Sequence, residues 1–85
     1  MAEKGKRRPA LEGVASADRA LTVLSAFRKG DRSLSLAELA ERTGLVKSTI
    51  MRLAISLEEH GYLAREEDSS YRLDAEVLRL GTVYT

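Results

Sequence analysis

The 85-residue sequence predicts a small, mainly α-helical fold with one short β-hairpin before its last helix. Three observations lead to this prediction. Apolar residues recur in four segments at the three- and four-residue spacing of a helix face. A capping-box pair and a glycine separate two of these segments by a tight turn. Two short strand-like stretches flank a polar turn further on.

The first predicted helix begins at Ser16, which suits an N-cap, and has Asp18 in its first turn. Gly30 is predicted to end it. The apolar residues that share its expected buried face are Leu21, Leu24 and Phe27.

The second predicted helix runs from Leu36 to about Thr43, after a brief extended piece at residues 33–34. Ser35 and Glu38 form the capping-box pair at its start, and Gly44 permits a tight turn after it. Two helices joined by a short glycine-containing turn form a helix-turn-helix.

The third predicted helix runs from about Val46 to His60, and its two halves carry opposite charges. Cations near a helix N-terminus oppose the macrodipole by about 0.3–1 kcal/mol, so stability alone disfavours this order. An external anion such as nucleic acid would explain it. The expected core face is Ile50, Leu53, Ala54 and Leu57; the opposite face is Ser48, Arg52, Ile55 and Glu59, flanked by Lys47 and Met51 on one side and Thr49 and Ser56 on the other.

The last part of the chain predicts a β-hairpin and a fourth helix. Residues 62–66 and 71–73 are strand-like, and the acidic and serine residues 67–70 form the turn. Asp74 suits the N-cap of a helix from Ala75, which Gly81 is predicted to interrupt. Because the apolar side of this helix lacks a partner, we expect the sequence to be a module of a longer protein.

Charge is unevenly distributed along the chain. Residues 1–14 contain a cluster of bases with Pro9 and few apolar groups, which predicts a flexible basic arm, either a solvated tail or a phosphate-seeking one. Residues 1–10 hold four of the fourteen bases and one of the thirteen acids, which leaves ten bases and twelve acids elsewhere. Any nucleic-acid footprint is therefore local. The bases of the arm are Lys4, Lys6, Arg7 and Arg8.

Composition and motifs argue against an enzyme. The chain has no cysteine, little room for a catalytic cavity, and neither a phosphate-binding glycine loop nor a nucleophile with a base. His60 is the only histidine and is expected at the surface, so no metal or cofactor is predicted. Without a signal peptide or an apolar run of bilayer length, we expect a cytoplasmic protein.

The order of the elements predicts a winged helix-turn-helix, whose third helix enters the major groove of DNA. Lys47, Ser48 and Thr49 suit phosphate oxygens, and Arg52 suits either guanine or a phosphate. The alternatives are that Ser48 or Thr49 only caps the first helical turn, and that Arg52 pairs with Ser56 or a neighbouring acid.

Three other surface residues each have two possible roles, and two arginines are expected only to face solvent. Met51 and Ile55 either touch thymine methyl groups or pack beneath the hairpin. Arg72 on the second strand either reaches a phosphate or lies in solvent. Arg42 and Arg19 are expected in solvent.

The segments "SADRALTVLSAF", "LSLAELAERTGLVKSTIMRLAISLEEHGYL" and "YRLDAEVLRLG" together resemble the N-terminal DNA-binding domain of the isocitrate lyase regulator (IclR) family of bacterial transcription factors. The resemblance covers about residues 16–85. It places Lys47, Ser48, Thr49 and Arg52 on the recognition helix and Ser35 near the DNA backbone. Two departures from the family pattern are Val46, where proline is usual, and Ser69 with Ser70, where the hairpin turn usually contains glycine.

The resemblance implies a homodimer, formed through the first helix and a linker helix, that binds palindromic promoter DNA. A small-molecule effector would act only through a C-terminal domain that these residues do not include. The expected organisation is an arm at 1–14, a winged helix-turn-helix at 15–74 and the start of the linker helix at 75–85. Sequence-specific binding of double-stranded DNA is the expected function. The alternatives are a protein-interaction winged helix without DNA binding and, less favoured with so few aromatic residues, an RNA-binding one.

Overall fold

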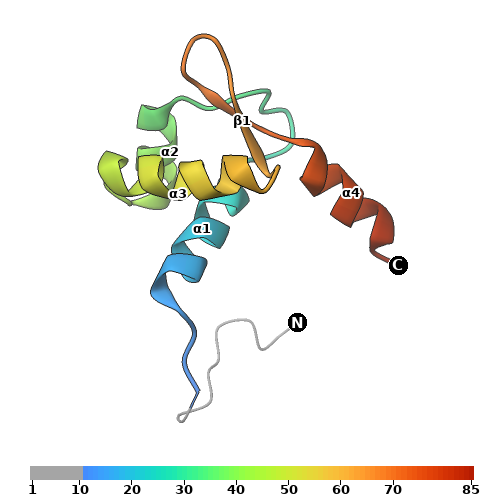
Figure 1. Ribbon diagram of the computed structural model, residues 1–85. Coiled ribbons are helices and arrows are strands. Elements are labelled where there is room, and N and C mark those ends of the chain that lie inside the picture. The colour runs from blue at the N-terminus through green and yellow to red at the C-terminus, as the bar shows by residue number, and fades with distance from the viewer. Residues whose placement is uncertain (1–10) are drawn as a thin grey trace.

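The computed structural model describes residues 11–85, and over that range the chain folds as four helices and a two-stranded antiparallel sheet (Figure 1). The predicted fold class is confirmed, and the predicted basic arm falls mostly on residues 1–10, outside the described range. The elements are α1 (Ala15–Ser25), α2 (Leu36–Thr43), α3 (Lys47–Glu59), β1 (Leu63–Arg65), β2 (Tyr71–Leu73) and α4 (Ala75–Val83).

The core lies where α1, α2 and α3 meet, beneath the hairpin. Val23 of α1, Leu39 of α2 and Ile50 of α3 are each fully buried there. Fully burying one such side chain contributes roughly 1.5–3 kcal/mol. Because each helix supplies one of these residues, none of the three can rotate without exposing apolar surface. The remaining buried apolar residues are Ala26, Leu34, Ala54, Leu57, Leu63 and Tyr71.

Helix α1 differs from its prediction at both ends. It begins at Ala15 after Val14, so Ser16 lies inside the first turn and the predicted serine cap is wrong. It ends at Ser25, five residues before Gly30, because the next two amides bond three residues back, in the tighter geometry that closes a helix. Gly30, with φ of 98°, serves the following turn instead.

The buried face of α1 is also rotated from the predicted one. Val23 is buried and Leu24 and Phe27 pack against the core, whereas Leu21 is 60% exposed. Ala20, Val23, Leu24 and Phe27 share one face at helical spacing, and Leu21 lies off it.

Arg42 ties α2 to the end of α1, so its predicted solvent exposure is wrong. Its Nη1 donates to the carbonyl of Ala26 at 2.9 Å and to Oδ2 of Asp31 at 2.6 Å. The guanidinium, with the backbone N–H of Arg28, lowers the pKa of the Asp31 carboxyl below its ordinary value of 3.8. Three segments therefore meet at one polar contact.

The hairpin pairs Leu63 with Leu73 and is joined by the extended residue Leu34, which exchanges two 2.8 Å backbone hydrogen bonds with Tyr71. The extended piece predicted before α2 is confirmed. Ser69 in the turn has φ of 72°, the left-handed conformation that glycine favours. Asp68 supports the turn by accepting from the N–H and hydroxyl of Ser70, and these bonds lower the Asp68 pKa.

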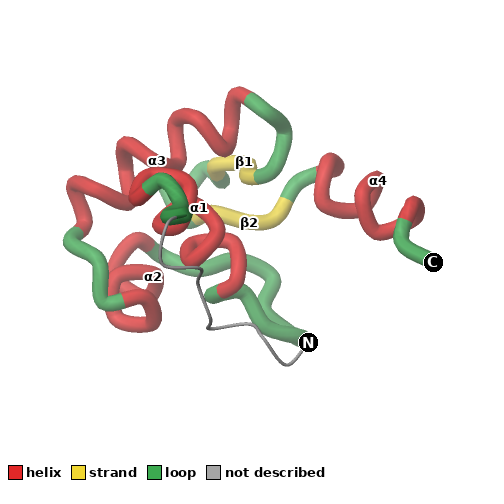
Figure 2. Tube along the Cα trace, turned by 90° about the horizontal axis from the view of Figure 1, so that it is seen from below, coloured by secondary structure: helices red, strands yellow, loops and turns green. Residues whose placement is uncertain are grey.

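Helix α4 begins as predicted, because Asp74 accepts from the N–H of Ala75 at 2.8 Å. The predicted interruption at Gly81 is wrong, since the helix continues to Val83. One glycine costs only about 1 kcal/mol in a helix relative to alanine. None of its residues is buried, and it projects from the three-helix body (Figure 2). Among the described helices, none combines the length and apolar character needed to cross a membrane.

We predict that Asp31→Asn weakens the fold in a pH-dependent way. The ionised carboxyl stabilises the native state above its ordinary pKa of 3.8, and this contribution disappears as pH falls through the lowered native pKa. The variant should therefore melt at a lower temperature than wild type at pH 7, and the difference between the two midpoints should be smaller at pH 3, below the ordinary pKa of 3.8. Circular dichroism melts at both pH values measure this, with the exposed Glu12→Gln as control. Equal midpoints at pH 7 would contradict the prediction.

Candidate nucleic-acid interface

The second and third helices form the predicted helix-turn-helix, with Gly44 between them in the left-handed conformation at φ of 77°. Gly44 donates its N–H to the carbonyl of Ala40 at 2.9 Å, which closes α2. Val46 then caps α3 with φ of −74°, within the range that proline imposes. The valine thus keeps the backbone direction that a proline at this position would preset.

The N-terminus of α3 is open to an external anion. Val46 has no side-chain oxygen to cap it, and the first turn has no acidic residue. The first amide with a partner four residues back is that of Ile50, which bonds the carbonyl of Val46. The preceding N–H groups, those of Lys47, Ser48 and Thr49, carry the positive end of the helix dipole. The alternative that Ser48 or Thr49 caps this turn is not seen.

The predicted rotation of α3 is confirmed. Ile50, Ala54 and Leu57 are buried and Leu53 is partly buried. Lys47, Ser48 and Arg52 are exposed, and Thr49 is half-buried. Ile55 remains 64% exposed and Met51 is also exposed, so neither packs beneath the hairpin. The outward surface therefore offers cations, hydroxyls and two apolar side chains.

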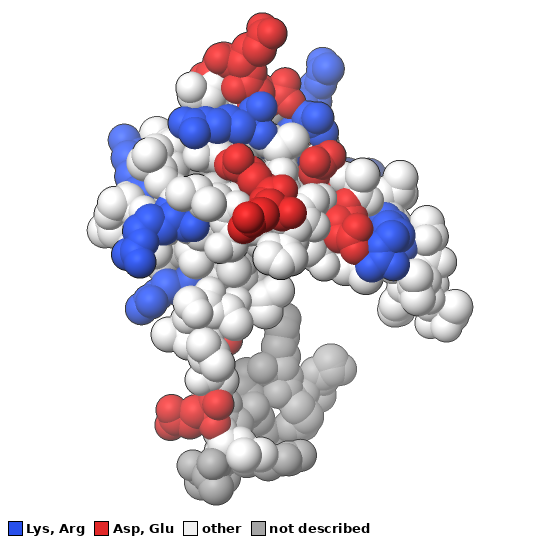
Figure 3. All heavy atoms as spheres, viewed as in Figure 1, with Lys and Arg blue, Asp and Glu red and all other residues white. Residues whose placement is uncertain are grey.

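Charge divides along α3 as the sequence predicted. In Figure 3 acidic side chains gather over the C-terminal end of α3, and basic side chains lie on the left, toward its start. Lys47 and Arg52 belong to the first part, Glu58 and Glu59 to the last. An approaching polyanion is attracted to one half of the helix and repelled by the other, which orients it.

Arg52 and Arg19 line one polar cleft between α3 and α1. The cleft has a volume of about 310 Å³, and its lining also includes Thr49, Leu53, Ser16 and Ser56. Among residues 11–85, no ion pair involves either arginine. Arg19 is exposed, as expected, and its place in the same cleft as Arg52 depends on the packing of α1 against α3. No local sequence signal could have revealed it.

Ser35 has a structural role at the start of α2. Its Oγ accepts from the N–H of Glu38 at 3.0 Å, and Glu38 Oε1 accepts from the N–H of Ser35 at 2.8 Å. The predicted capping box is confirmed. Because the cap uses the serine oxygen as an acceptor, the hydroxyl can still donate to an external acceptor.

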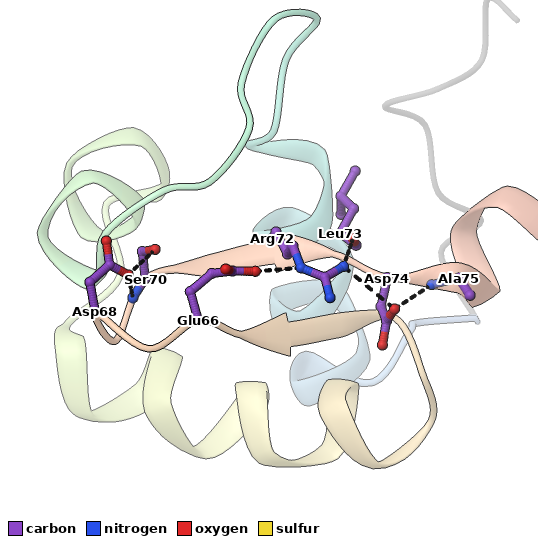
Figure 4. Close-up of polar contacts among 7 residues, drawn as sticks. All are labelled: Glu66, Asp68, Ser70, Arg72, Leu73, Asp74 and Ala75. Carbon is purple, nitrogen blue, oxygen red and sulfur yellow. Dashed lines mark hydrogen bonds and ion pairs between the residues drawn. The ribbon is translucent and has the colours of Figure 1, made fainter.

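Arg72 is engaged by the protein itself, which neither sequence interpretation anticipated (Figure 4). Its Nε donates to Glu66, its Nη1 lies 3.6 Å from Oδ1 of Asp74, and the same nitrogen donates to the carbonyl of Leu73 at 3.3 Å. The side chain is 47% exposed, yet two carboxylates surround its charge.

The described residues also form an apolar hollow of about 430 Å³ away from the polar face of α3. It lies between α1, the end of α3, the base of the hairpin and α4. The residues that line the hollow are Ala20, Leu21, Leu24, Leu57, Tyr62, Leu73, Val77 and Leu80.

Over residues 11–85, no group of three or more histidine or acidic residues is arranged to hold a metal ion.

Comparison with known proteins gives a consistent family likeness. Residues 16–67 match the IclR helix-turn-helix domain. The chain is 36% identical over 72 residues to the glycerol operon regulatory protein of Streptomyces coelicolor, covering 84% of this chain and 28% of that protein. It is 37% identical over 81 residues to a helix-turn-helix-type transcriptional regulator of Mycobacterium tuberculosis, covering 94% and 30%.

Solved structures give the same result. An IclR family transcriptional regulator from Brucella abortus superposes with a TM-score of 0.77 at 37% identity, covering 85% of this chain and 28% of that one. A regulator from Alicyclobacillus acidocaldarius gives 0.76 at 30% identity, covering 84% and 29%. The chain spans under a third of the length of these relatives.

We predict that Ser35→Ala lowers the free energy of unfolding by about 0.5–2 kcal/mol, because the N–H of Glu38 loses its acceptor. Ser48→Ala is the matched control, since Ser48 is exposed and an exposed substitution away from special features changes stability by less than about 0.5 kcal/mol. Urea denaturation followed by circular dichroism measures both. Equal effects of the two variants would show that the cap contributes nothing at Ser35.

Proposed function

The chain belongs to the IclR helix-turn-helix family, and on that premise we propose that it binds double-stranded DNA sequence-specifically as the DNA-binding part of a transcriptional regulator. In this proposal α3 enters the major groove with its N-terminal half nearest the bases. Regulation then results from occupying promoter DNA, without chemistry on it.

The observation that carries the proposal is the uncapped, acid-free start of α3 beside exposed Lys47, Ser48 and Arg52. Free N–H groups, the helix dipole and a lysine all favour a phosphate at this point. An uncapped helix start with cations beside it lowers the stability of the isolated domain, and a bound polyanion would offset this loss. Thr49, which lines the cleft, and Ser35 at the start of α2 are proposed as further hydroxyl donors to the DNA backbone.

Within this interface, the two arginines of the cleft suit a phosphodiester. Arg52 and Arg19 line the same polar cavity, and guanidinium groups bind phosphate oxygens in bidentate pairs. A contact of this kind orients the protein without reading the base sequence. Exposed Met51 and Ile55 offer apolar contacts of the kind that thymine methyl groups accept. We therefore place sequence discrimination partly on these two side chains.

The alternative of a protein-interaction module is favoured by one observation, the exposed pair Met51 and Ile55. It requires nothing of Lys47 and Arg52, whereas DNA binding requires both. Substitution of Arg52 therefore separates the two functions.

We also propose that two copies of the chain associate through the hollow between α1 and α4. Leu21 and Leu80 line it and remain substantially exposed in one copy. A second copy would cover this apolar surface, and two helix-turn-helix units would then read two half-sites. One small domain makes few contacts, so pairing raises the affinity for a palindromic site.

For DNA binding, we predict that Arg52→Ala weakens the complex with a duplex from the gene's own upstream region. Loss of a phosphate contact should make the negative slope of log K against log salt shallower by about 0.9. Loss of a guanine contact should instead reduce the free-energy difference between the correct and the wrong base by about 1–3 kcal/mol. Fluorescence anisotropy at two salt concentrations, with a scrambled duplex for comparison, distinguishes the two results. Arg79→Ala is the control, because Arg79 pairs with Glu76 on α4.

The wild-type titration decides between the functions. Tighter binding to the upstream duplex than to the scrambled one supports the proposal. Equal binding to both would reject sequence specificity for that site. No binding at low salt would overturn DNA binding and favour the protein-interaction function.

For association, we predict that Leu80→Asp weakens the dimer by roughly ten- to a hundredfold. The half-exposed leucine of each copy loses about half of the 1.5–3 kcal/mol of full apolar burial, which is about 1.5–3 kcal/mol for the two copies together. Leu78→Asp is the matched control, since Leu78 is on the same helix but does not line the hollow. Sedimentation equilibrium measures the dissociation constant of each variant. A monomeric wild type, or equal effects of both variants, would contradict association through the hollow.

A further inference from the structure

The hairpin contains two basic residues, and both are already engaged. Arg72 contacts Glu66 and Asp74, as described above. The guanidinium carbon of Arg65 lies 5.6 Å from the centre of the Tyr71 ring, which is cation–π distance. Residues 63–74 carry four acids against these two bases, so the segment is net negative. Figure 3 shows acidic side chains crowding the tip of the hairpin.

Glu66 and Arg72 meet in a polar cleft, and Glu66 is the one acid among the described residues that line it. This cleft of about 280 Å³ is lined by Arg32, Ser33, Glu66 and Arg72. Two guanidinium groups and a hydroxyl on one concave surface are the donors that bind a phosphate. The Glu66 carboxylate supplies the negative charge there from within the chain, on the side of Arg72 away from Asp74 (Figure 4).

The two acids differ in what else they do. Asp74 accepts from the N–H of Ala75 as the cap of α4, so it is fixed by the fold. Glu66 makes its side-chain contact with Arg72, and its backbone N–H bonds the carbonyl of Ser70 across the turn. A change of the Glu66 side chain therefore alters the charge near Arg72 without removing a cap or a backbone bond.

We propose that Glu66 masks Arg72 and thereby keeps the hairpin from contacting the DNA backbone. The inference rests on the proposed function and deepens it. DNA contact is then confined to the helix-turn-helix, and Glu66 sets how much the hairpin contributes to affinity. A bound phosphate near Arg72 would have to displace Glu66 and approach a net negative segment. The hairpin then contributes little sequence-independent affinity for DNA. A larger fraction of the binding free energy therefore comes from contacts of α3.

The test compares four variants with wild type in salt titrations of an upstream and a scrambled duplex. Glu66→Gln keeps the shape and removes the charge that masks Arg72. The slope of log K against log salt should become steeper by about 0.9, because one phosphate contact is gained. The affinity at 0.1 M salt should rise by up to about eightfold, on both duplexes alike. Glu67→Gln is the matched control, because it removes the same charge one residue away and Glu67 pairs with no described base. It should change affinity by less than about twofold.

Two further variants complete the cycle. Arg72→Ala alone should leave both affinity and slope unchanged, because the masked arginine makes no DNA contact. In the double variant Glu66→Gln with Arg72→Ala, which has the net charge of wild type, affinity should return to the wild-type level. Circular dichroism melts of all four verify that each is folded at the titration temperature.

The opposite results overturn the proposal. If the slope of log K against log salt became shallower by about one unit in Arg72→Ala alone, Arg72 would contact DNA in wild type. Equal effects of Glu66→Gln and Glu67→Gln would show that net charge matters and masking does not. A gain that persists in the double variant, which has the net charge of wild type, would show that the gain does not come from Arg72. If neither wild type nor Glu66→Gln binds either duplex, the proposed function itself fails, and this outcome differs from all the others.

Discussion

The mutual burial of Val23, Leu39 and Ile50 is the constraint on which the rest of the structure depends. Each residue comes from a different helix, so the rotation of α3 is fixed by packing and by nothing at its exposed surface. Once Ile50 faces inward, helical geometry places Ser48 and Arg52 outward. The outer face is therefore free to vary in chemistry without changing the fold. This separation allows a helix start that is poor for stability to persist, because the core supplies the stability that the uncapped end lacks.

Polar contacts supplement this small core at its edges. A domain of this size buries only about 60% of its unfolded surface, so contacts outside the core matter to its stability. Arg42 joins the end of α1 to Asp31 in the following loop, and the Leu34–Tyr71 pairing joins the residues before α2 to the hairpin. Both act on the segment between α1 and α2. The helix-turn-helix is thus held at its beginning by two independent attachments, one ionic and one through the backbone.

Features that depend on local spacing could be predicted from the sequence, and features that depend on distant segments could not. The core face of α3, the Ser35 capping box and the Asp74 cap follow from residues within one or two helical turns of each other. The partners of Arg42 lie 11 and 16 residues away, so its position requires the tertiary fold. Arg72 and Glu66 are six residues apart but meet only because the hairpin brings the residue after β1 beside β2. The predicted interruption at Gly81 was wrong because one glycine costs only about 1 kcal/mol relative to alanine, which does not suffice to end a helix.

Helix α4 has a mechanical consequence that its sequence does not suggest. Its first turn is attached to the body by two backbone bonds, from Asp74 to Tyr62 and from Glu76 to Gly61, and none of its residues is buried. A nine-residue helix is about 14 Å long at about 1.5 Å per residue, so the far end of α4 lies well beyond these two bonds. A small rotation of α4 about them would displace its far end by several times the movement near Asp74. Because the two bonds adjoin the base of the hairpin, such a rotation would act on the hairpin, whose strand β1 contacts α3.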